Sequence, residues 1–263
     1  MKLERDSHGH KGTFGTVLAI GGSYGELVMF GGIVFAAKAC LRSGAGKVII
    51  ALPEETAAAA IGLLPEAIVL PIDQARPNLA NLRKYIDSSD VIVVGPGWAN
   101  ADYQEKVLKV VLEARKETII DAGALHIIAT NNQLAKMVHN KCILTPHSGE
   151  MTKLNQGLGC SDAKSLSVKT SATVVHKSFT TELTDGDRSW TLNKPNSVLA
   201  TAGSGDVLAG MISGLLAQYL HTYNQFDIVK TAIKEHSKAG EQLVSGSLAS
   251  ELIDKIVIKS QSN

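Results

Sequence analysis

Residues 17–23 read Val-Leu-Ala-Ile-Gly-Gly-Ser, four apolar residues in a row followed at once by two glycines and a serine. An unbroken apolar run, with no polar residues in alternation, indicates a strand that is covered on both faces, as in a parallel sheet. Similar short apolar runs follow along the chain at residues 48–52, 91–94, 118–120, 143–144 and 174–175. The chain is therefore predicted to contain a mostly parallel sheet.

Helical patterns lie between these runs, so strands and helices alternate. Helices are expected at residues 32–42, 78–86, 102–115, 133–138, 161–171, 206–220, 226–244 and 248–258. The turn signal at residues 184–187, Thr-Asp-Gly-Asp, also predicts a β-hairpin. This order predicts an α/β fold with three layers, in which helices flank a mostly parallel central sheet. No linker or repeat divides the chain, so residues 1–263 are expected to form a single domain.

Composition narrows the class of protein. Hydrophobic residues make up 44% of the 263 residues, enough for a large core. The 26 basic and 25 acidic residues leave a net charge of +1, and no basic stripe indicates nucleic-acid binding. Cys40, Cys142 and Cys160 follow no metal or redox spacing. With no signal peptide and no apolar run of about 18 residues, we expect a cytoplasmic protein that does not enter the membrane.

Glycines and polar residues follow directly on several predicted strands. Ligands of open α/β sheets bind outside the carboxyl ends of the strands. The segments 21–23 (Gly-Gly-Ser) and 95–97 (Gly-Pro-Gly) both stand at such ends, and so does Asp121. A ligand-binding loop and an ordinary structural turn remain equally open for both glycine segments. Neither matches the dinucleotide fingerprint or the P-loop.

Residues 200–214, Ala-Thr-Ala-Gly-Ser-Gly-Asp-Val-Leu-Ala-Gly-Met-Ile-Ser-Gly, carry the strongest functional signal. Small residues lead into an apolar helix, whose first amides favour an anion such as phosphate. Asp206 is a carboxylate in that anion site. It is explained either as a simple helix cap or as a base that takes a proton from a hydroxyl while the turn, residues 203–206, holds a phosphoryl group.

Two further segments fit phosphate chemistry. Residues 145–150 read Thr-Pro-His-Ser-Gly-Glu. His147 is predicted to bind substrate and Glu150 to lie near a water-bound Mg²⁺, although Glu150 also fits a plain helix-start acid. Lys177, followed by Thr180 and Thr181, suits a diphosphate, although a lone lysine at a strand end is often merely solvated.

Together these segments resemble the ADP-dependent NAD(P)H-hydrate dehydratases, carbohydrate-kinase-like proteins of the ribokinase superfamily. The resemblance spans residues 8–256. It rests on His10-Lys-Gly-Thr-Phe-Gly15, the segment 17–23, Leu41-Arg-Ser-Gly-Ala-Gly46, the segment 95–97, Asp121-Ala-Gly-Ala-Leu125, Leu144-Thr-Pro-His-Ser-Gly-Glu150 and Ala202-Gly-Ser-Gly-Asp-Val-Leu-Ala-Gly210. A ribokinase-like fold is the implied architecture.

The family uses ADP to dehydrate the S epimer of NADH or NADPH hydrate, which yields NAD(P)H, AMP and phosphate. The resemblance implies that Asp206 contacts the hydrate and acts as the base. It implies that Gly32, Gly97 and His147 line the hydrate pocket. The adenine nucleotide is implied to lie against Gly205 and a loop formed by Lys177, Ser178, Phe179, Thr180 and Thr181. ADP is thus the expected co-substrate and Mg²⁺ the expected cofactor, with its ligands unassigned.

The resemblance also implies a homotetramer. It implies an epimerase on a separate protein, because this chain is too short to hold both domains. Three departures stand out: Ser178 where the family usually has glycine, about three extra residues at 26–28, and Ala99 where the family has a final glycine. If position 178 needs a positive φ, Ser178 strains the nucleotide loop. No arginine can be assigned to a 2′-phosphate, so the choice between NADH and NADPH hydrate stays open.

Two other functions remain possible at this stage. An ATP-dependent small-molecule kinase of the same superfamily would use the same base and anion site. His147 and the leading segment 10–12, His-Lys-Gly, favour the dehydratase. A non-catalytic nucleotide-binding protein on the same fold is the other alternative, because fold does not fix function. Ser178 and the extra residues 26–28 are the features that leave it open.

Overall fold

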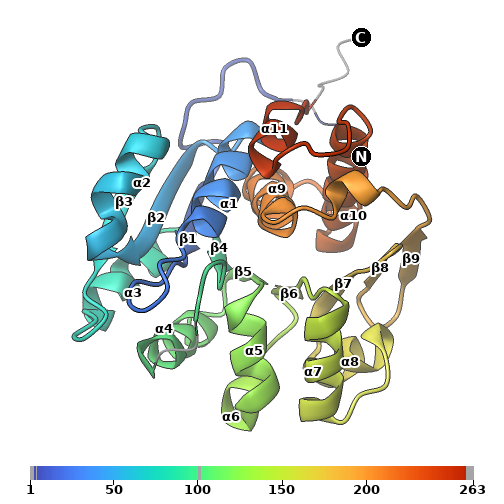
Figure 1. Cartoon of the computed structure of the whole chain (residues 1–263), viewed down its shortest axis with the longest axis horizontal. Helices are drawn as coiled ribbons and strands as arrows, with labels where there is room; N and C mark the ends of the chain where they lie inside the picture. Colours follow the sequence, from blue (N-terminus) through green and yellow to red (C-terminus); the bar gives the residue numbers. More distant parts are fainter. Residues whose placement is uncertain (1–2, 4, 100–101, 259–263) are drawn as a thin grey trace.

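The computed structural model describes residues 3, 5–99 and 102–258 (Figure 1). Within them a nine-stranded sheet runs through the molecule in the order β3-β2-β1-β4-β5-β6-β7-β8-β9. The strands are β1 (Thr16–Ile20), β2 (Lys47–Pro53), β3 (Ile68–Ile72), β4 (Val91–Val94), β5 (Glu117–Ile120), β6 (Cys142–Leu144), β7 (Thr173–Lys177), β8 (Thr181–Thr184) and β9 (Ser189–Leu192). In this order, neighbouring strands from β3 to β7 are parallel. Strand β8 is antiparallel to both of its neighbours, β7 and β9. The predicted parallel sheet and hairpin are confirmed.

Helices cover both faces of the sheet, which confirms the three layers (Figure 1). One face carries α1 (Gly31–Arg42), α2 (Ala57–Leu63), α9 (Ser204–Tyr219), α10 (Gln225–Gly240) and α11 (Ala249–Asp254). The other face carries α3 (Leu79–Asp87), α4 (Asp102–Glu113), α5 (Gly123–Thr130), α6 (Asn132–Ala135), α7 (Ser148–Leu158) and α8 (Ala163–Thr170). Two short 3₁₀ helices are η1 (Glu54–Thr56) and η2 (Ser197–Leu199). No helix of the described residues is long and apolar enough to cross a membrane.

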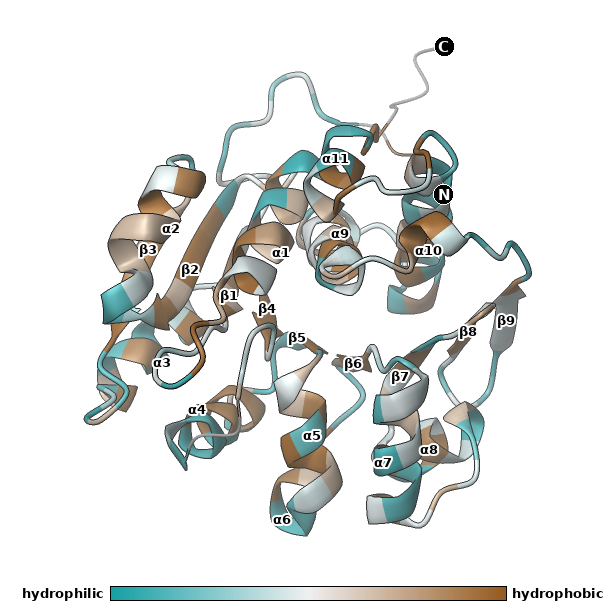
Figure 2. Cartoon of the chain, viewed as in Figure 1, coloured by the Kyte–Doolittle hydropathy of each residue, from teal (hydrophilic) through white to brown (hydrophobic). Residues whose placement is uncertain are grey.

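The apolar strands explain why the sheet is covered twice. In β1, Val17 and Ala19 pack into the core of the α1–α9 face, and Leu18 and Ile20 pack into the core of the other. Successive strand side chains point to opposite faces, so a fully apolar run needs helices on both. Figure 2 shows hydrophobic strands, such as β2, between helices that carry both hydrophobic and hydrophilic residues.

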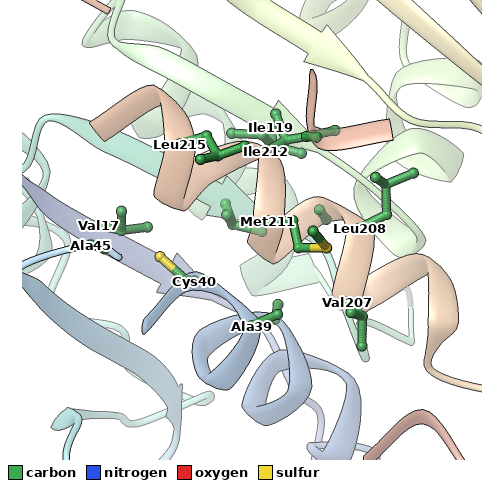
Figure 3. Packing of buried hydrophobic residues seen from close by; sticks show 14 of the residues in the cluster. Val17, Ala39, Cys40, Ala45, Ile119, Val207, Leu208, Met211, Ile212 and Leu215 are labelled. Carbon is green, nitrogen blue, oxygen red and sulfur yellow. The ribbon is translucent and has the colours of Figure 1, made fainter. Parts of the chain in front are cut away.

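Small residues let α9 approach α1 closely. A Cβ on Gly214 would lie 2.5 Å from the carbonyl oxygen of Cys40. One on Gly210 would overlap the carbonyl oxygen of Ala36. Met211 and Ile212 on α9 are fully buried in the same core (Figure 3). This packing fixes α9 along its length, and its first turn thereby lies at the carboxyl edge of the sheet.

The differences from prediction have local causes. Strand β3 went unpredicted because it is an edge strand, contains Pro71 and alternates between exposed and buried residues. The short helices α2 and α5 and the longer α7 were also not predicted as elements. Helix α6 ends at Ala135 rather than at residue 138, α10 ends at Gly240 rather than at 244, and α9 begins two residues early, at Ser204.

Candidate active site

Four charged side chains meet where β5, β6 and β7 end beside α9. The ammonium Nζ of Lys177, the last residue of β7, lies 2.9 Å from Oδ1 of Asp121, which follows β5. Only 3% of the Asp121 side chain is exposed. Glu150 on α7 and Asp206 on α9 act electrostatically on the same lysine. One half-buried cation and three carboxylates, from four separate segments of the chain, are therefore brought together.

This arrangement changes the acidity of its members. Burial, reinforced by the charge of Asp121, raises the pKa of Asp206 from 3.8 to about 7. Burial and Asp121 likewise raise the pKa of Glu150. Burial alone would lower the pKa of Lys177, but Asp121 and Glu150 outweigh it and raise that pKa. A carboxylate whose pKa is near 7 is suited to take a proton at neutral pH.

The first turn of α9 is where the sequence predicts an anion site. Gly203 caps the helix at φ 94°, a conformation that favours glycine. Ser204, Gly205 and Asp206 are the first three helical residues, so their amides belong to the group that has no partner within the helix. A Cβ on Gly205 would lie 3.0 Å from Lys177 Nζ. The amide of Ser204 donates to the carbonyl oxygen of Thr201 at 3.2 Å, so Gly205 is the residue of this turn that lies beside the ammonium group.

His147 and Glu150 cap helix α7 together. The amides of Gly149 and Glu150 donate to His147 Nδ1, and the amide of His147 donates to Glu150 Oε2 at 2.8 Å. The helix-start interpretation of Glu150 is therefore correct, and it does not exclude a role in the charged cluster. The imidazole side chain is 61% exposed, with Nε2 directed toward Glu150 Oε1 at 3.5 Å. Both ring nitrogens of His147 therefore face groups of α7, while the ring itself is open to the solvent.

A cavity of about 670 Å³ opens beside the first turn of α9. Its wall includes Lys177, Ser178, Phe179, Thr181 and Gly205, five of the six residues predicted to bind the nucleotide. The sixth, Thr180, instead accepts hydrogen bonds at its carbonyl oxygen from the amide and hydroxyl of Ser178. The remaining wall is largely apolar and comes from β9, η2, α9 and α10. A mostly apolar wall next to a cationic end suits a nucleoside diphosphate.

A second cavity, of about 380 Å³, lies on the other side of His147. Trp98, Gly149, Glu150 and His126 contribute to its wall. Ala122, also in the wall, has φ 48° and ψ −122°, a conformation that alanine rarely adopts. Backbone strain of this kind gathers at functional sites. His147 lines both cavities and so marks the point where they meet.

The two glycine segments at residues 21–23 and 95–97 prove to be interlocked turns. The amide of Gly22 donates to the carbonyl oxygen of Pro96 at 2.8 Å. The hydroxyl of Ser23 is buried and accepts from the amide of Ala99 and from Gln104 Nε2, each at 3.0 Å. Gly97, at φ 74°, packs against Gly22. The structural interpretation of segment 21–23 is therefore favoured over a nucleotide-binding one.

The structure also places Gly32, and it shows that Ser178, one of the departures from the family pattern, causes no strain. A Cβ on Gly32 would lie 3.0 Å from Asp206 Oδ2, so the two residues are in contact. Gly32, Gly97 and Asp206 lie outside the walls of the two cavities described above. Ser178 is not among the residues with positive φ, so serine causes no strain there. Leu27 and Val28, within the extra segment 26–28, are exposed.

Several residues at this edge were not assigned a role from sequence. Asp121 was noted only as a polar residue after a strand, and nothing in the sequence pairs it with Lys177. His236 and Ser237 on α10 line the larger cavity, although they stand in an ordinary amphipathic helix pattern. The available sequence signal for a role of these two residues was their polarity on an otherwise apolar face of the helix.

No group of three or more histidine, cysteine, aspartate or glutamate side chains in residues 3, 5–99 and 102–258 is arranged to hold a metal ion by itself. Mg²⁺ usually needs only one or two carboxylates, with water and phosphate oxygens completing its shell. Asp121 and Glu150 therefore fit the predicted Mg²⁺, provided that the nucleotide supplies further ligands.

Comparison with known proteins agrees with this geometry. The family model of NAD(P)H-hydrate dehydratase matches residues 17–261. The chain is 34% identical over 245 residues to the ADP-dependent (S)-NAD(P)H-hydrate dehydratase of Streptococcus thermophilus, covering 89% of this chain and 84% of that protein. It spans about half of the bifunctional NAD(P)H-hydrate repair enzymes that it matches, 48% of the one from Gloeobacter violaceus.

Solved structures are similar over almost the whole chain. A ribokinase-like superfamily protein from Enterococcus faecalis superposes with a TM-score of 0.84 at 27% identity, covering 97% of this chain and 89% of that one. The ADP/ATP-dependent NAD(P)H-hydrate dehydratase of Bacillus subtilis, co-crystallized with ATP/Mg²⁺, gives a TM-score of 0.76 at 28% identity, with coverage of 97% and 92%. The predicted ribokinase-like fold is confirmed.

Proposed function

The chain belongs to the NAD(P)H-hydrate dehydratase family, and on that premise we propose that it catalyses the ADP-dependent dehydration of (S)-NAD(P)H hydrate. The products are NAD(P)H, AMP and phosphate. One observation supports this most directly: Asp206, with its pKa raised to about 7, stands in the first turn of α9 beside Lys177 and the larger cavity. The relatives named above carry the same activity in their names.

The chemistry begins at a poor leaving group, the hydroxyl of the hydrate. Asp206 takes its proton while the hydroxyl oxygen attacks the β-phosphorus of ADP, and the bond from that phosphorus to the bridging oxygen breaks to release AMP. The ring nitrogen then supplies the electron pair that expels phosphate, and loss of a proton from the neighbouring ring carbon forms the double bond of NAD(P)H. A positioned base of this kind contributes about 10²–10⁴-fold to rate. The amides of Gly205 and Asp206, with Lys177, stabilise the transferring phosphoryl group.

The two cavities suggest where each substrate lies. The larger one, with its apolar wall and Lys177, fits the adenine nucleotide. The smaller one, with Trp98, His147 and Glu150, fits the nicotinamide side of the hydrate. Asp206, in contact with Gly32, would then stand between them. When bound, Mg²⁺ would be held by Asp121 and Glu150 and would neutralise diphosphate charge.

The alternative of a small-molecule kinase shares the base and the anion site. It is less well supported, because the dehydratase relatives cover most of this chain at 31–34% identity. The non-catalytic alternative loses one of its two supports, since Ser178 adopts an ordinary backbone conformation.

The direct test follows the return of NADH absorbance from NADH hydrate, with ADP or ATP added. We expect recovery with the wild-type protein, and a loss of about 10²–10⁴-fold in Asp206→Asn, with ADP affinity by calorimetry largely unchanged. Near-normal turnover in that variant would refute the base. If the wild-type protein restores no NADH yet phosphorylates an alcohol with ATP, the protein is a kinase instead. ADP binding without any turnover would favour the non-catalytic protein.

Three wider features belong to the same proposal. We propose a homotetramer, which light scattering after size-exclusion chromatography would test. An epimerase on a separate protein would interconvert the two hydrates, and the longer bifunctional relatives support such pairing. A cytoplasmic location, testable by cell fractionation, fits the three free cysteines.

A further inference from the structure

His236 on α10 makes a contact that none of the steps above uses. Its ring is buried, and Nε2 lies 3.1 Å from the carbonyl oxygen of Ser204 and 3.4 Å from the Ser204 hydroxyl. A carbonyl oxygen only accepts, so Nε2 carries the proton and donates. Burial lowers the pKa of His236 to about 4, so the ring is neutral at physiological pH.

The partner of this hydrogen bond is part of the anion site. The carbonyl group of Ser204 and the amide of Gly205 belong to one planar peptide unit and point in opposite directions. Whatever holds the oxygen therefore also sets the direction of the Gly205 N–H. A donor on the oxygen additionally polarises the amide, because hydrogen bonds in a chain strengthen one another.

The surroundings show what that amide faces. Gly205 lines the larger cavity and lies next to Lys177 Nζ, at the position of the predicted phosphoryl group. His236 lines the same cavity from the α10 side. The ring thus stands behind the peptide whose front carries the anion donor.

We propose that His236 is a positioning residue that orients and polarises the Gly205 amide toward the nucleotide's phosphate, acting through the Ser204 carbonyl. The inference rests on the proposed use of ADP. This role differs from a direct contact with the adenine ring, which His236 could also make from the cavity wall. It predicts that His236 matters for the diphosphate and not for the nucleoside.

The test measures binding of ADP and of adenosine to the full chain by calorimetry. In His236→Leu we expect ADP affinity to fall about tenfold while adenosine affinity is unchanged. In His236→Gln the side-chain amide can still donate to the carbonyl, so ADP affinity should recover in large part. The turnover number with NADH hydrate should follow the same order across the three proteins.

His139 supplies the matched control. It is a second buried histidine, also with a pKa lowered by burial, but it lies near Cys142 at the opposite end of the sheet. His139→Leu should reduce thermal stability without separating ADP from adenosine. If His236→Leu loses both ligands equally, or if His236→Gln fails to recover, the positioning role is wrong. If the wild-type protein binds no ADP, the proposed function itself fails, which is a different result.

Discussion

Two glycine-rich turns stand at the same edge of the sheet, and they do opposite things. The turn at residues 21–23 donates its amides to Ala51, Pro96 and Met29, and its serine is buried. The turn at residues 203–206 starts a helix, and Gly205 within it lines the larger cavity beside Lys177. In sequence both are small-residue turns beside an apolar run.

The difference lies in where the backbone hydrogen bonds go. A buried amide must find a partner, and the first turn finds its partners in β2 and in two neighbouring loops. The second turn starts a helix, whose first amides cannot be satisfied internally, and of these the amide of Ser204 donates to the carbonyl oxygen of Thr201. Composition alone cannot separate a closed turn from an open one, since the partners come from distant residues.

The sharpest test of this contrast exchanges one glycine for alanine in each turn. A Cβ on Gly21 would overlap the carbonyl oxygen of Pro96 and lie 2.9 Å from Ile33 Cβ. Because the obstacle is backbone, Gly21→Ala should cost roughly 3 kcal/mol or more in the free energy of unfolding. Urea unfolding followed by circular dichroism measures this.

Gly205→Ala is the matched variant in the open turn. Its Cβ would meet only the flexible end of Lys177, at 3.0 Å, and alanine favours a helix. Stability should hold or rise, while ADP affinity falls about tenfold or more. The contrast is wrong if Gly205→Ala unfolds the protein, or if Gly21→Ala is stable and loses only ADP.

A second prediction concerns the pH dependence of stability, because the ionised carboxylate of Asp206 in the open turn destabilises the folded protein. The folded pKa of Asp206, about 7, lies above its unfolded value near 3.8. Between these values the folded state binds more protons, so stability falls as pH rises, by up to about 1.4 kcal/mol per pH unit. Asp206→Asn removes this loss, so its stability relative to wild type should grow from pH 4 to 7 and then level off.

Asp185, in the β8–β9 hairpin, supplies a control of opposite sign. Burial there would raise its pKa, but hydrogen bonds from the backbone and side chain of Arg188 lower it instead. Its ionised form stabilises the protein above the unfolded pKa, so Asp185→Asn should lose stability at pH 7. An advantage of Asp206→Asn that is the same at every pH would contradict the assigned shift.

The sequence predicts the architecture far better than the contacts between the site residues. Continuous apolar runs predicted every parallel strand except the edge strand β3, where Pro71 interrupts the run. The pairing of Asp121 with Lys177 could not be predicted, because it depends on β5 and β7 ending at one edge on either side of β6. His236 was missed for the same reason: its partner, Ser204, is a backbone carbonyl on another helix.

The smallest expected effect concerns Ser23 in the closed turn. Its hydroxyl accepts from the amide of Ala99 and from Gln104 Nε2, so Ser23→Ala removes both hydrogen bonds, of which the one from Gln104 is buried. The loss should be about 2 kcal/mol in the free energy of unfolding, with ADP affinity and turnover unchanged. Ser43→Ala is the control, because the buried Ser43 hydroxyl has no hydrogen-bond partner in the described part of the chain, and its removal should cost almost nothing. Weaker ADP binding at full stability in Ser23→Ala would instead make the turn at residues 21–23 part of the nucleotide site.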